Sequence, residues 1–374
     1  MFLKPQGNEP TETMPLVPKY INELSPYTPG KPIDEVKREL GLEKITKLAS
    51  NENPLGPSPL ALEAIRKAEE RLHRYPDASG FKLRQKLAQR FNVKIDNVIL
   101  GAGSEGIMAT IMRTFLLPED EIITALNSFI GFTVLARGSG KRVHWIPMKD
   151  HRYDLEAMAS CINEYTKIIY LANPDNPMGT YCTVDEFDAF MEKVPERVLI
   201  IMDEAYFEFA QPISDYPDSM HYRYDNVITL RTFSKAYGLA GLRIGYGFAH
   251  DQLISNLLKV KLPFEPSLLA QSAGMAALED VYHLDKTIQI TRDGLSYFSD
   301  ELSRLGIDYI PSVTNFITIK WPTPERCDEV CQKMIEEGVI LRHLKPFGWP
   351  DCLRVSIGIH SENEPCVSTL KEIL

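Results

Sequence analysis

Two stretches decide the fold: RVLIIMDEAYFEF at residues 197–209 and NVITLRTFSKAYGLAGLRIGYG at residues 226–247. Each opens with a short run rich in Val, Ile and Leu, which is typical of a parallel strand buried on both faces. Such runs alternate along the chain with helical patterns, and this alternation predicts an α/β fold with a doubly wound, mostly parallel sheet flanked by helices. Further strands are expected at residues 97–101, 121–125, 142–148, 167–172 and 242–249, and helices at 58–72, 81–91, 105–116 and 183–194.

The pattern changes near residue 270. A nearly continuous helical pattern at 271–306 is followed by strands at 314–320, 339–344 and 353–359 and a helix at 324–338. Frequent prolines exclude a long helix from the N-terminal part. We therefore expect three parts: an N-terminal arm at residues 1–45, a large domain at 46–270 and a smaller α+β domain at 271–374.

Composition and charge narrow the range of functions. The 374-residue chain has a formal net charge of −10, which disfavours binding to nucleic acid or to an anionic membrane surface. The first 15 residues hold no apolar core of signal-peptide length, and no apolar run is long enough to span a membrane. The six cysteines form no Cys-x-x-Cys pair, so we expect neither a metal site nor a redox motif. These observations predict a cytoplasmic protein with reduced thiols.

Lys235 is the first candidate for chemistry. It follows a strand pattern and lies among the hydroxyls of Thr232 and Ser234, with Arg243 in the glycine-rich stretch that comes next. Hydroxyls, backbone N–H groups and an arginine are the donors that hold a phosphate group. A lysine at the rim of such a cup can condense with an aldehyde if its pKa is lowered. The alternative is a solvated lysine in a glycine-containing loop.

Asp203 and Asn176 are candidates for contacts to an aromatic ring. Asp203 ends an apolar strand, where the carboxyl ends of parallel strands open onto a ligand crevice. Its carboxylate can keep a pyridine nitrogen protonated, and Tyr206 follows three positions later. Asn176 lies in the turn ANPDNPMGT at 172–180 and can bind a ring hydroxyl. The alternatives are an aspartate that caps the next turn and a turn without function.

LGAGSEGIM at 100–108 connects a strand to a helix, so the amides of Gly103 and Ser104 can bind a phosphate at the helix N-terminus. A nicotinamide-binding fingerprint is the competing interpretation, but the acidic residues at the expected distance, Glu119, Asp120 and Glu121, begin a strand instead of ending one. RGSGKR at 137–142 resembles the end of a nucleotide phosphate loop. Leu135 stands where that loop needs its first glycine, so we expect a helix end that leads into a strand.

Arg354, in LRVSIG, and Arg342, in VILRHL, are the remaining candidates for binding an anion. An arginine presents a planar fork that a carboxylate or a phosphate accepts through two hydrogen bonds. The alternative for either residue is a surface salt bridge.

Taken in order, these segments resemble the class I/II aminotransferases of fold type I, and among them the histidinol-phosphate aminotransferase family. The resemblance extends over nearly the whole chain. Its most specific parts are ASNENPLGPSP, HRYPDASGFKLRQKLA, NPDNPMGT, DEAYFEF and SKAYGLAGLRIGYG. It implies a large domain with a mostly parallel sheet, a smaller α+β domain and the cofactor pyridoxal 5'-phosphate.

The resemblance also implies a role for each cofactor-binding residue. Lys235 would form the Schiff base with the cofactor and move protons. Asp203 would pair with the pyridine nitrogen, and Asn176 and Tyr206 would face the 3-hydroxyl group. The phosphate would be held by Thr232, Ser234, Arg243 and the amides of Gly103 and Ser104.

Other implied residues lie at the ring face and at the substrate. Phe129 is the first candidate to stack on the ring, and Phe132 is the second. Tyr75 would reach the cofactor of a neighbouring subunit, which implies a homodimer with shared active sites. Arg354 would bind the α-carboxylate of glutamate. The substrate end would be completed by Arg342, Tyr27 and Asn53.

The implied reaction is reversible transfer of an amino group between histidinol phosphate and 2-oxoglutarate, giving imidazole acetol phosphate and glutamate. An aromatic amino-acid aminotransferase and a phosphoamino-acid decarboxylase of the same fold remain alternatives, as does a regulator that only binds the cofactor. The chain departs from the family at Phe129, commonly tyrosine, and at Met178, commonly threonine. Phenylalanine still stacks on a pyridine face, so the first change loses only a hydroxyl contact.

Overall fold

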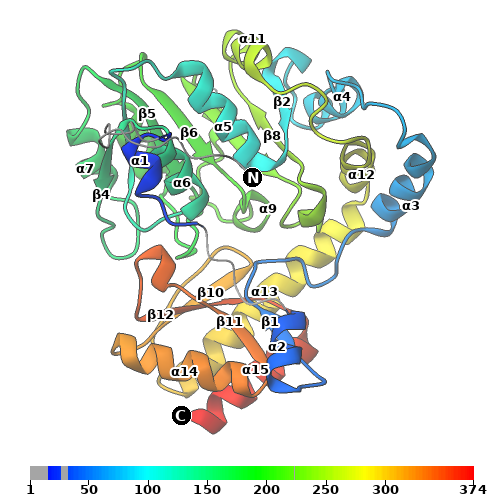
Figure 1. Cartoon of the computed structure of the whole chain (residues 1–374), viewed down its shortest axis with the longest axis vertical. Helices are drawn as coiled ribbons and strands as arrows, with labels where there is room; N and C mark the ends of the chain where they lie inside the picture. Colours follow the sequence, from blue (N-terminus) through cyan, green and yellow to red (C-terminus); the bar gives the residue numbers. More distant parts are fainter. Residues whose placement is uncertain (1–15, 27–32, 223) are drawn as a thin grey trace, which may run out of the picture.

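The structure is a computed structural model that describes residues 16–26, 33–222 and 224–374. Its larger part is a seven-stranded sheet with helices around it (Figure 1), in the order β2-β8-β7-β6-β5-β3-β4. β8 is antiparallel to both of its neighbours, and the other pairs are parallel. The strands are β2 (Val98–Gly101), β3 (Glu121–Ala125), β4 (Arg142–Ile146), β5 (Thr166–Ala172), β6 (Leu199–Asp203), β7 (Val227–Thr232) and β8 (Gly245–Phe248).

Strand β5 shows why this sheet forms from apolar runs. Ile168 and Tyr170 belong to the hydrophobic core on one face, whereas Ile169 and Leu171 belong to the core on the other. Burial on both faces requires apolar residues at every position, which confirms the predicted doubly wound α/β class.

Helices cover the two faces of the large sheet, and their starts follow from local chemistry. Ser58 caps the first of them: its Oγ accepts a hydrogen bond from the Ala61 N–H, and Pro59 occupies the first helical position. RGSGKR leads from a helix end into β4, as expected. The helices of this part are α3 (Pro59–Ala68), α4 (Phe81–Arg90), α5 (Gly103–Phe115), α6 (Ile130–Gly138), α7 (Leu155–Ser160), α8 (Val184–Met191), α9 (Phe207–Ala210), α10 (Ser219–Tyr222), α11 (Asp251–Val260) and α12 (Leu268–Glu279), with 3-10 turns η1 (Glu69–Arg71), η2 (Ile95–Asn97) and η3 (Ala240–Leu242).

The smaller part contains a five-stranded sheet in the order β1-β11-β12-β10-β9. Only its β1–β11 pair is parallel. The strands are β1 (Thr46–Leu48), β9 (Tyr309–Ile310), β10 (Phe316–Lys320), β11 (Val339–His343) and β12 (Cys352–Ser356). The accompanying helices are α2 (Ile33–Leu40), α13 (Val281–Arg304), α14 (Pro324–Glu336) and α15 (His360–Ile373), with 3-10 turn η4 (Lys345–Phe347); α1 (Lys19–Asn22) packs near α6 in the larger part.

Two details differ from the sequence analysis. Residues 46–48 fall in the range expected for the large domain, with no strand predicted there, but they form β1, which pairs with β11 in the smaller sheet. The expected continuous helix at 271–306 is interrupted at Asp280, which ends α12 and caps α13 by accepting a hydrogen bond from the His283 N–H. The division of the chain into an arm at 1–45, a large domain at 46–270 and a small domain at 271–374 remains a prediction. No helix in the described part of the chain has the length and apolar character to cross a membrane.

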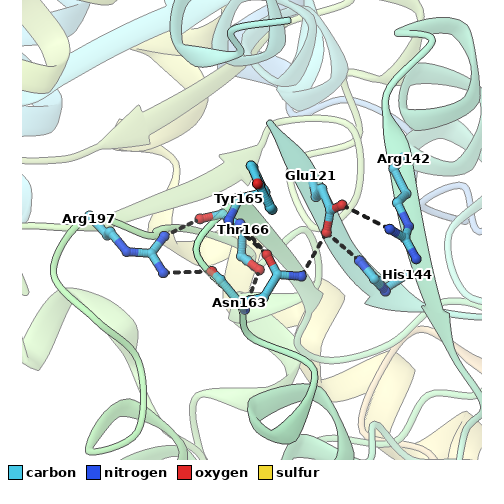
Figure 2. Close-up of polar contacts among 7 residues, drawn as sticks. All are labelled: Glu121, Arg142, His144, Asn163, Tyr165, Thr166 and Arg197. Atoms are coloured by element: carbon cyan, nitrogen blue, oxygen red, sulfur yellow. Dashed lines mark hydrogen bonds and ion pairs between the residues drawn. The ribbon is translucent and has the colours of Figure 1, made fainter. Parts of the chain in front are cut away.

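A polar cluster lies at the amino ends of β3, β4 and β5 (Figure 2). The buried Glu121 carboxylate accepts a hydrogen bond from Asn163 Nδ2 at 2.8 Å and lies 2.6 Å from His144 Nε2. Arg197 donates to the carbonyl oxygens of Asn163 and Thr166. Hydrogen bonds from Asn163 and His144 hold the pKa of Glu121 below its ordinary value. The cluster therefore joins three strand ends at the edge opposite the carboxyl ends of the same strands.

We predict that Glu121→Gln lowers the apparent Tm by about 1–3 °C at neutral pH. A lowered pKa means that the ionised group stabilises the fold above its unfolded-state pKa, near 4.3, and loses this effect as the pH falls through the folded-state pKa. The deficit relative to wild type should therefore shrink below about pH 4. Thermal unfolding at several pH values measures it. The control is Glu156→Gln, a carboxylate 75% exposed that pairs with Lys193. A deficit that is independent of pH would contradict the prediction.

Candidate active site

The carboxyl ends of β5, β6 and β7 open into one cavity of about 660 Å³, which is also lined by the first turns of α5 and α6. Ligand sites of open α/β sheets lie at this edge of the sheet. Most of the cofactor-binding residues expected from sequence line it: Ser104, Phe129, Asn176, Asp203, Tyr206, Thr232, Ser234, Lys235 and Arg243.

Lys235, the candidate nucleophile, lines this cavity. Burial, together with the positive charge of Arg354, lowers the pKa of its amine to about 8. The amine nitrogen lies 5.6 Å from the centre of the Tyr206 ring. A much larger fraction of the amine is therefore neutral at physiological pH than for a solvated lysine. The alternative of a solvated lysine is wrong.

Asp203 presents an acceptor that the described residues leave unused. The side chain is 4% exposed; its Oδ2 accepts a hydrogen bond from the Tyr170 hydroxyl at 2.8 Å, whereas the buried Oδ1 accepts none from the described residues. Burial raises the pKa of this carboxyl to about 7. A buried acceptor without a donor is costly, and a protonated pyridine nitrogen is a donor that would satisfy it. The site thus fits pyridoxal phosphate.

The two phenylalanines considered for ring stacking lie in different surroundings. Phe132 is fully buried and stacks on Tyr170, with ring centres 3.9 Å apart. It therefore supports the tyrosine that holds Asp203, while Phe129 is the one that lines the cavity.

Donors for a phosphate group gather at one end of the cavity. The Thr232 hydroxyl donates to Ser234 Oγ at 3.0 Å, and Arg243 Nη1 donates to the same oxygen at 3.3 Å. Gly103 has a φ of +75°, and a Cβ there would lie 2.6 Å from Arg243 Nη2. Glycine is thus required for the helix start to approach the arginine. The Glu105 carboxylate lies 3.5 Å from Arg243 Nη2, a contact that was not predicted from sequence.

Arg354 and Arg342 lie on the smaller sheet; neither lines the cavity, but Arg354 contacts Asn176, which does. They are register partners on β12 and β11, so their side chains share one face. Both are buried, which excludes a surface salt bridge. Arg354 donates to Asn176 Oδ1 and to the Ala49 carbonyl oxygen. The first bond uses the acceptor of the Asn176 amide and leaves its NH₂ group as the donor for a ring oxygen.

Asn51 is a second residue that the sequence analysis missed. Its Nδ2 donates to the Tyr206 hydroxyl at 2.9 Å. Its backbone N–H donates to Ser356 Oγ at 2.7 Å, and the Ser356 hydroxyl donates back to Asn51 Oδ1 at 3.0 Å. Burial raises the pKa of Tyr206 to about 12, so the phenol stays protonated at physiological pH. Asn51 thereby connects a candidate catalytic tyrosine with β12.

Asn53 and Tyr75 are not among the described residues that line the cavity. Asn53 uses its amide internally, donating to the Ala236 carbonyl oxygen and to Thr287 Oγ1, and its role at the substrate stays a prediction. Tyr75 is 80% exposed and stacks on Phe264, with ring centres 4.3 Å apart. Tyr27 lies outside the described residues. Met178 is fully buried in an apolar cluster with Leu344 and Phe347 of the smaller part, which accounts for an apolar residue at this position of the turn.

Comparisons with known proteins agree with this geometry. The model of the family "Aminotransferase class I and II" matches residues 43–369. Histidinol-phosphate aminotransferase 2 of Carboxydothermus hydrogenoformans is 42% identical over 361 residues, which cover 96% of this chain and 99% of the relative. The histidinol-phosphate aminotransferase of Moorella thermoacetica is 41% identical over 376 residues, covering 100% of this chain and 97% of the relative.

A solved structure shows the same arrangement of the chain. The histidinol-phosphate aminotransferase of Sinorhizobium meliloti, crystallised in complex with pyridoxal 5'-phosphate, superposes with a TM-score of 0.87 at 28% sequence identity. The match covers 97% of this chain and 98% of that one. With a family match over most of its length and full-length relatives above 40% identity, the chain belongs to the class I and II aminotransferases.

Proposed function

We propose that the chain is a histidinol-phosphate aminotransferase of histidine biosynthesis that uses pyridoxal 5'-phosphate and exchanges an amino group between histidinol phosphate and 2-oxoglutarate. One observation carries the proposal: a partly buried lysine with a lowered pKa and a buried carboxylate with an unused acceptor line the same cavity. The names of the full-length relatives support the choice of substrate.

Each residue of the cavity has a task in this reaction. When bound, the cofactor supplies an electron-withdrawing ring that accepts negative charge from the substrate Cα. Asp203 keeps the pyridine nitrogen protonated through its free Oδ1. Lys235 removes the proton from Cα and returns one, which a neutral amine with a pKa near 8 can do at physiological pH. Thr232, Ser234 and Arg243 hold the cofactor phosphate.

The arginine pair supports two anionic substrates. Glutamate presents carboxylates and histidinol phosphate presents a phosphate group, and both accept paired hydrogen bonds from a guanidinium group. Arg354 and Arg342 lie side by side on one face of the smaller sheet, so the same pair can serve each substrate in turn.

We further propose a cytoplasmic homodimer with shared active sites. The exposed Tyr75 ring stacks on Phe264, and Leu72 and Leu262 are exposed as well. An exposed group of large apolar side chains is typical of a protein interface, and a tyrosine within it can reach into a partner's cavity. All six cysteines are free thiols, as expected for a reducing compartment.

The function is tested with glutamate as donor and two acceptors, imidazole acetol phosphate and phenylpyruvate. We predict a kcat/KM at least about tenfold higher for imidazole acetol phosphate, because its phosphate adds charge-assisted hydrogen bonds. A preference for phenylpyruvate would identify an aromatic amino-acid aminotransferase. Release of carbon dioxide from a phosphoamino acid would identify a decarboxylase, and cofactor binding without any turnover would indicate a regulator.

The lowered pKa of Lys235 predicts how cofactor-free protein takes up pyridoxal phosphate. Only the neutral amine attacks an aldehyde, so the rate at which the visible absorbance band appears should rise about tenfold per pH unit below about pH 8 and level off above it. Stopped-flow absorbance measures this rate. Lys235→Ala should show no band, whereas Lys320→Ala, a change at an exposed strand end, should behave as wild type. A midpoint near pH 10 would contradict the assignment.

Replacing Arg354 with Ala should reduce kcat/KM for glutamate about 30-fold or more, because a buried charged partner of the substrate carboxylate is lost. The cofactor should still bind, since the phosphate donors are unchanged. Steady-state kinetics with glutamate and an absorbance spectrum measure both effects. Arg326→Ala, which removes an arginine paired with Glu329 on α14, is the control. Unchanged glutamate kinetics would remove this role from Arg354.

A further inference from the structure

A buried hydrogen bond joins the residues that precede two members of the site. Ser128 comes directly before Phe129, at the start of α6, and Asp175 comes directly before Asn176, in the turn after β5. The Ser128 hydroxyl donates to Asp175 Oδ1 at 2.5 Å, and both side chains are buried. The backbone segments that carry the stacking ring and the ring-facing amide are therefore connected by one short contact.

This contact is part of a chain of hydrogen bonds with a defined direction. The Tyr153 hydroxyl lies 2.7 Å from Ser128 Oγ and accepts a hydrogen bond from the Ala172 N–H at 3.1 Å. Ser128 has a single proton, which goes to the carboxylate, so Tyr153 is the donor between the two hydroxyls. The other carboxylate oxygen, Asp175 Oδ2, accepts from the Met178 N–H at 3.0 Å. Each donor is thus matched to one acceptor.

The far end of the chain reaches the third member of the site. Ala172 is the last residue of β5 and is the register partner of Asp203 on β6. The hydrogen bonds therefore run from the strand end beside Asp203, through Tyr153 and Ser128, to the turn that carries Asn176. The start of α6, the segment at Tyr153 and the turn after β5 are thus joined by hydrogen bonds.

We propose that Tyr153, Ser128 and Asp175 are positioning residues, which set the separation between the Phe129 ring and the Asn176 amide and so the fit of the cofactor ring between them. None of the three side chains lines the main cavity, so each acts through its neighbour in sequence. The inference rests on the proposed function, because it assigns the ring between these residues to pyridoxal phosphate.

Asp175 is the last acceptor in this chain of hydrogen bonds, and its carboxylate is ionised under mildly alkaline conditions. Burial raises the pKa of Asp175 to about 7, and the hydrogen bonds from Ser128 and the Met178 N–H, together with the charge of Arg354, oppose this rise. Affinities should therefore be compared at about pH 8, where the acceptor is ionised.

The test uses Ser128→Ala in the full-length protein, with absorbance spectra and affinity as readouts. Without its donor the turn before Asn176 loses its anchor, so the dissociation constant of pyridoxal phosphate should rise at least about fivefold, the effect of one buried charge-assisted hydrogen bond. The amide of Asn176 withdraws charge from the ring oxygen. Its displacement should therefore raise the pKa read from the pH-dependent absorbance of the bound cofactor by about half a unit or more.

Three further variants separate positioning from simple packing. Ser128→Thr keeps the hydroxyl and should restore the wild-type affinity and spectrum. Tyr153→Phe breaks the chain one link earlier and should shift both readouts in the same direction as Ser128→Ala. The matched control is Ser139→Ala, which removes a hydroxyl that donates to the Ala136 carbonyl oxygen at the other end of α6. It should leave both readouts unchanged.

The inference is overturned if folded Ser128→Ala and Tyr153→Phe proteins both have the wild-type affinity and absorbance pKa. If Ser128→Ala does not fold, the same two readouts on Tyr153→Phe and Ser128→Thr decide the matter. If the wild-type protein neither binds pyridoxal phosphate nor transfers an amino group, the proposed function is refuted. If the wild-type protein does both and the variants match it in affinity and absorbance pKa, only the positioning role is refuted.

Discussion

The lowered pKa of the Lys235 amine is the constraint on which the rest of the site depends. Desolvation and nearby positive charge each favour the neutral, nucleophilic form of a lysine, and at Lys235 desolvation acts together with the charges of Arg354 and Arg243. The sheet makes this possible, because β5, β6 and β7 end at the same edge and bring Asp203 and Lys235 to one cavity. Glu52 and Glu105 offset part of the positive charge at the amine.

The site is completed by bonds between the larger and the smaller part. Arg354 on β12 donates to Asn176, and the Thr318 hydroxyl on β10 donates to the Pro177 carbonyl oxygen at 2.7 Å. Asn51 bonds both Tyr206 and Ser356. The turn that carries Asn176 and Pro177 is consequently held by β12, which also carries Arg354, and by β10. Under the proposed function, the residues assigned to the substrate and to the cofactor are therefore coupled through a few buried hydrogen bonds.

The residues that were predicted from sequence belong to local patterns, whereas the residues that were missed make contacts with distant parts of the chain. The ends of β6 and β7 were predicted because a strand followed by a polar residue is a local pattern, and Asp203 and Lys235 both fit it. Asn51 was missed because its partners lie 155 and 305 positions away. The pairing of β1 with β11 was missed for the same reason. Phe132 shows the reverse case, since the family resemblance made it the second candidate for stacking but its ring packs on Tyr170 in the core.

The central claim is that the ε-amine of Lys235 is the group bonded to the cofactor aldehyde, and chemical trapping tests it most directly. Borohydride reduces a C=N bond to a stable single bond, so treatment of the protein loaded with pyridoxal phosphate fixes the cofactor to the lysine that holds it. Peptide mass spectrometry then locates the label. We predict one modified peptide, labelled at Lys235. A label on a different lysine, with Lys235 unmodified, would contradict the account.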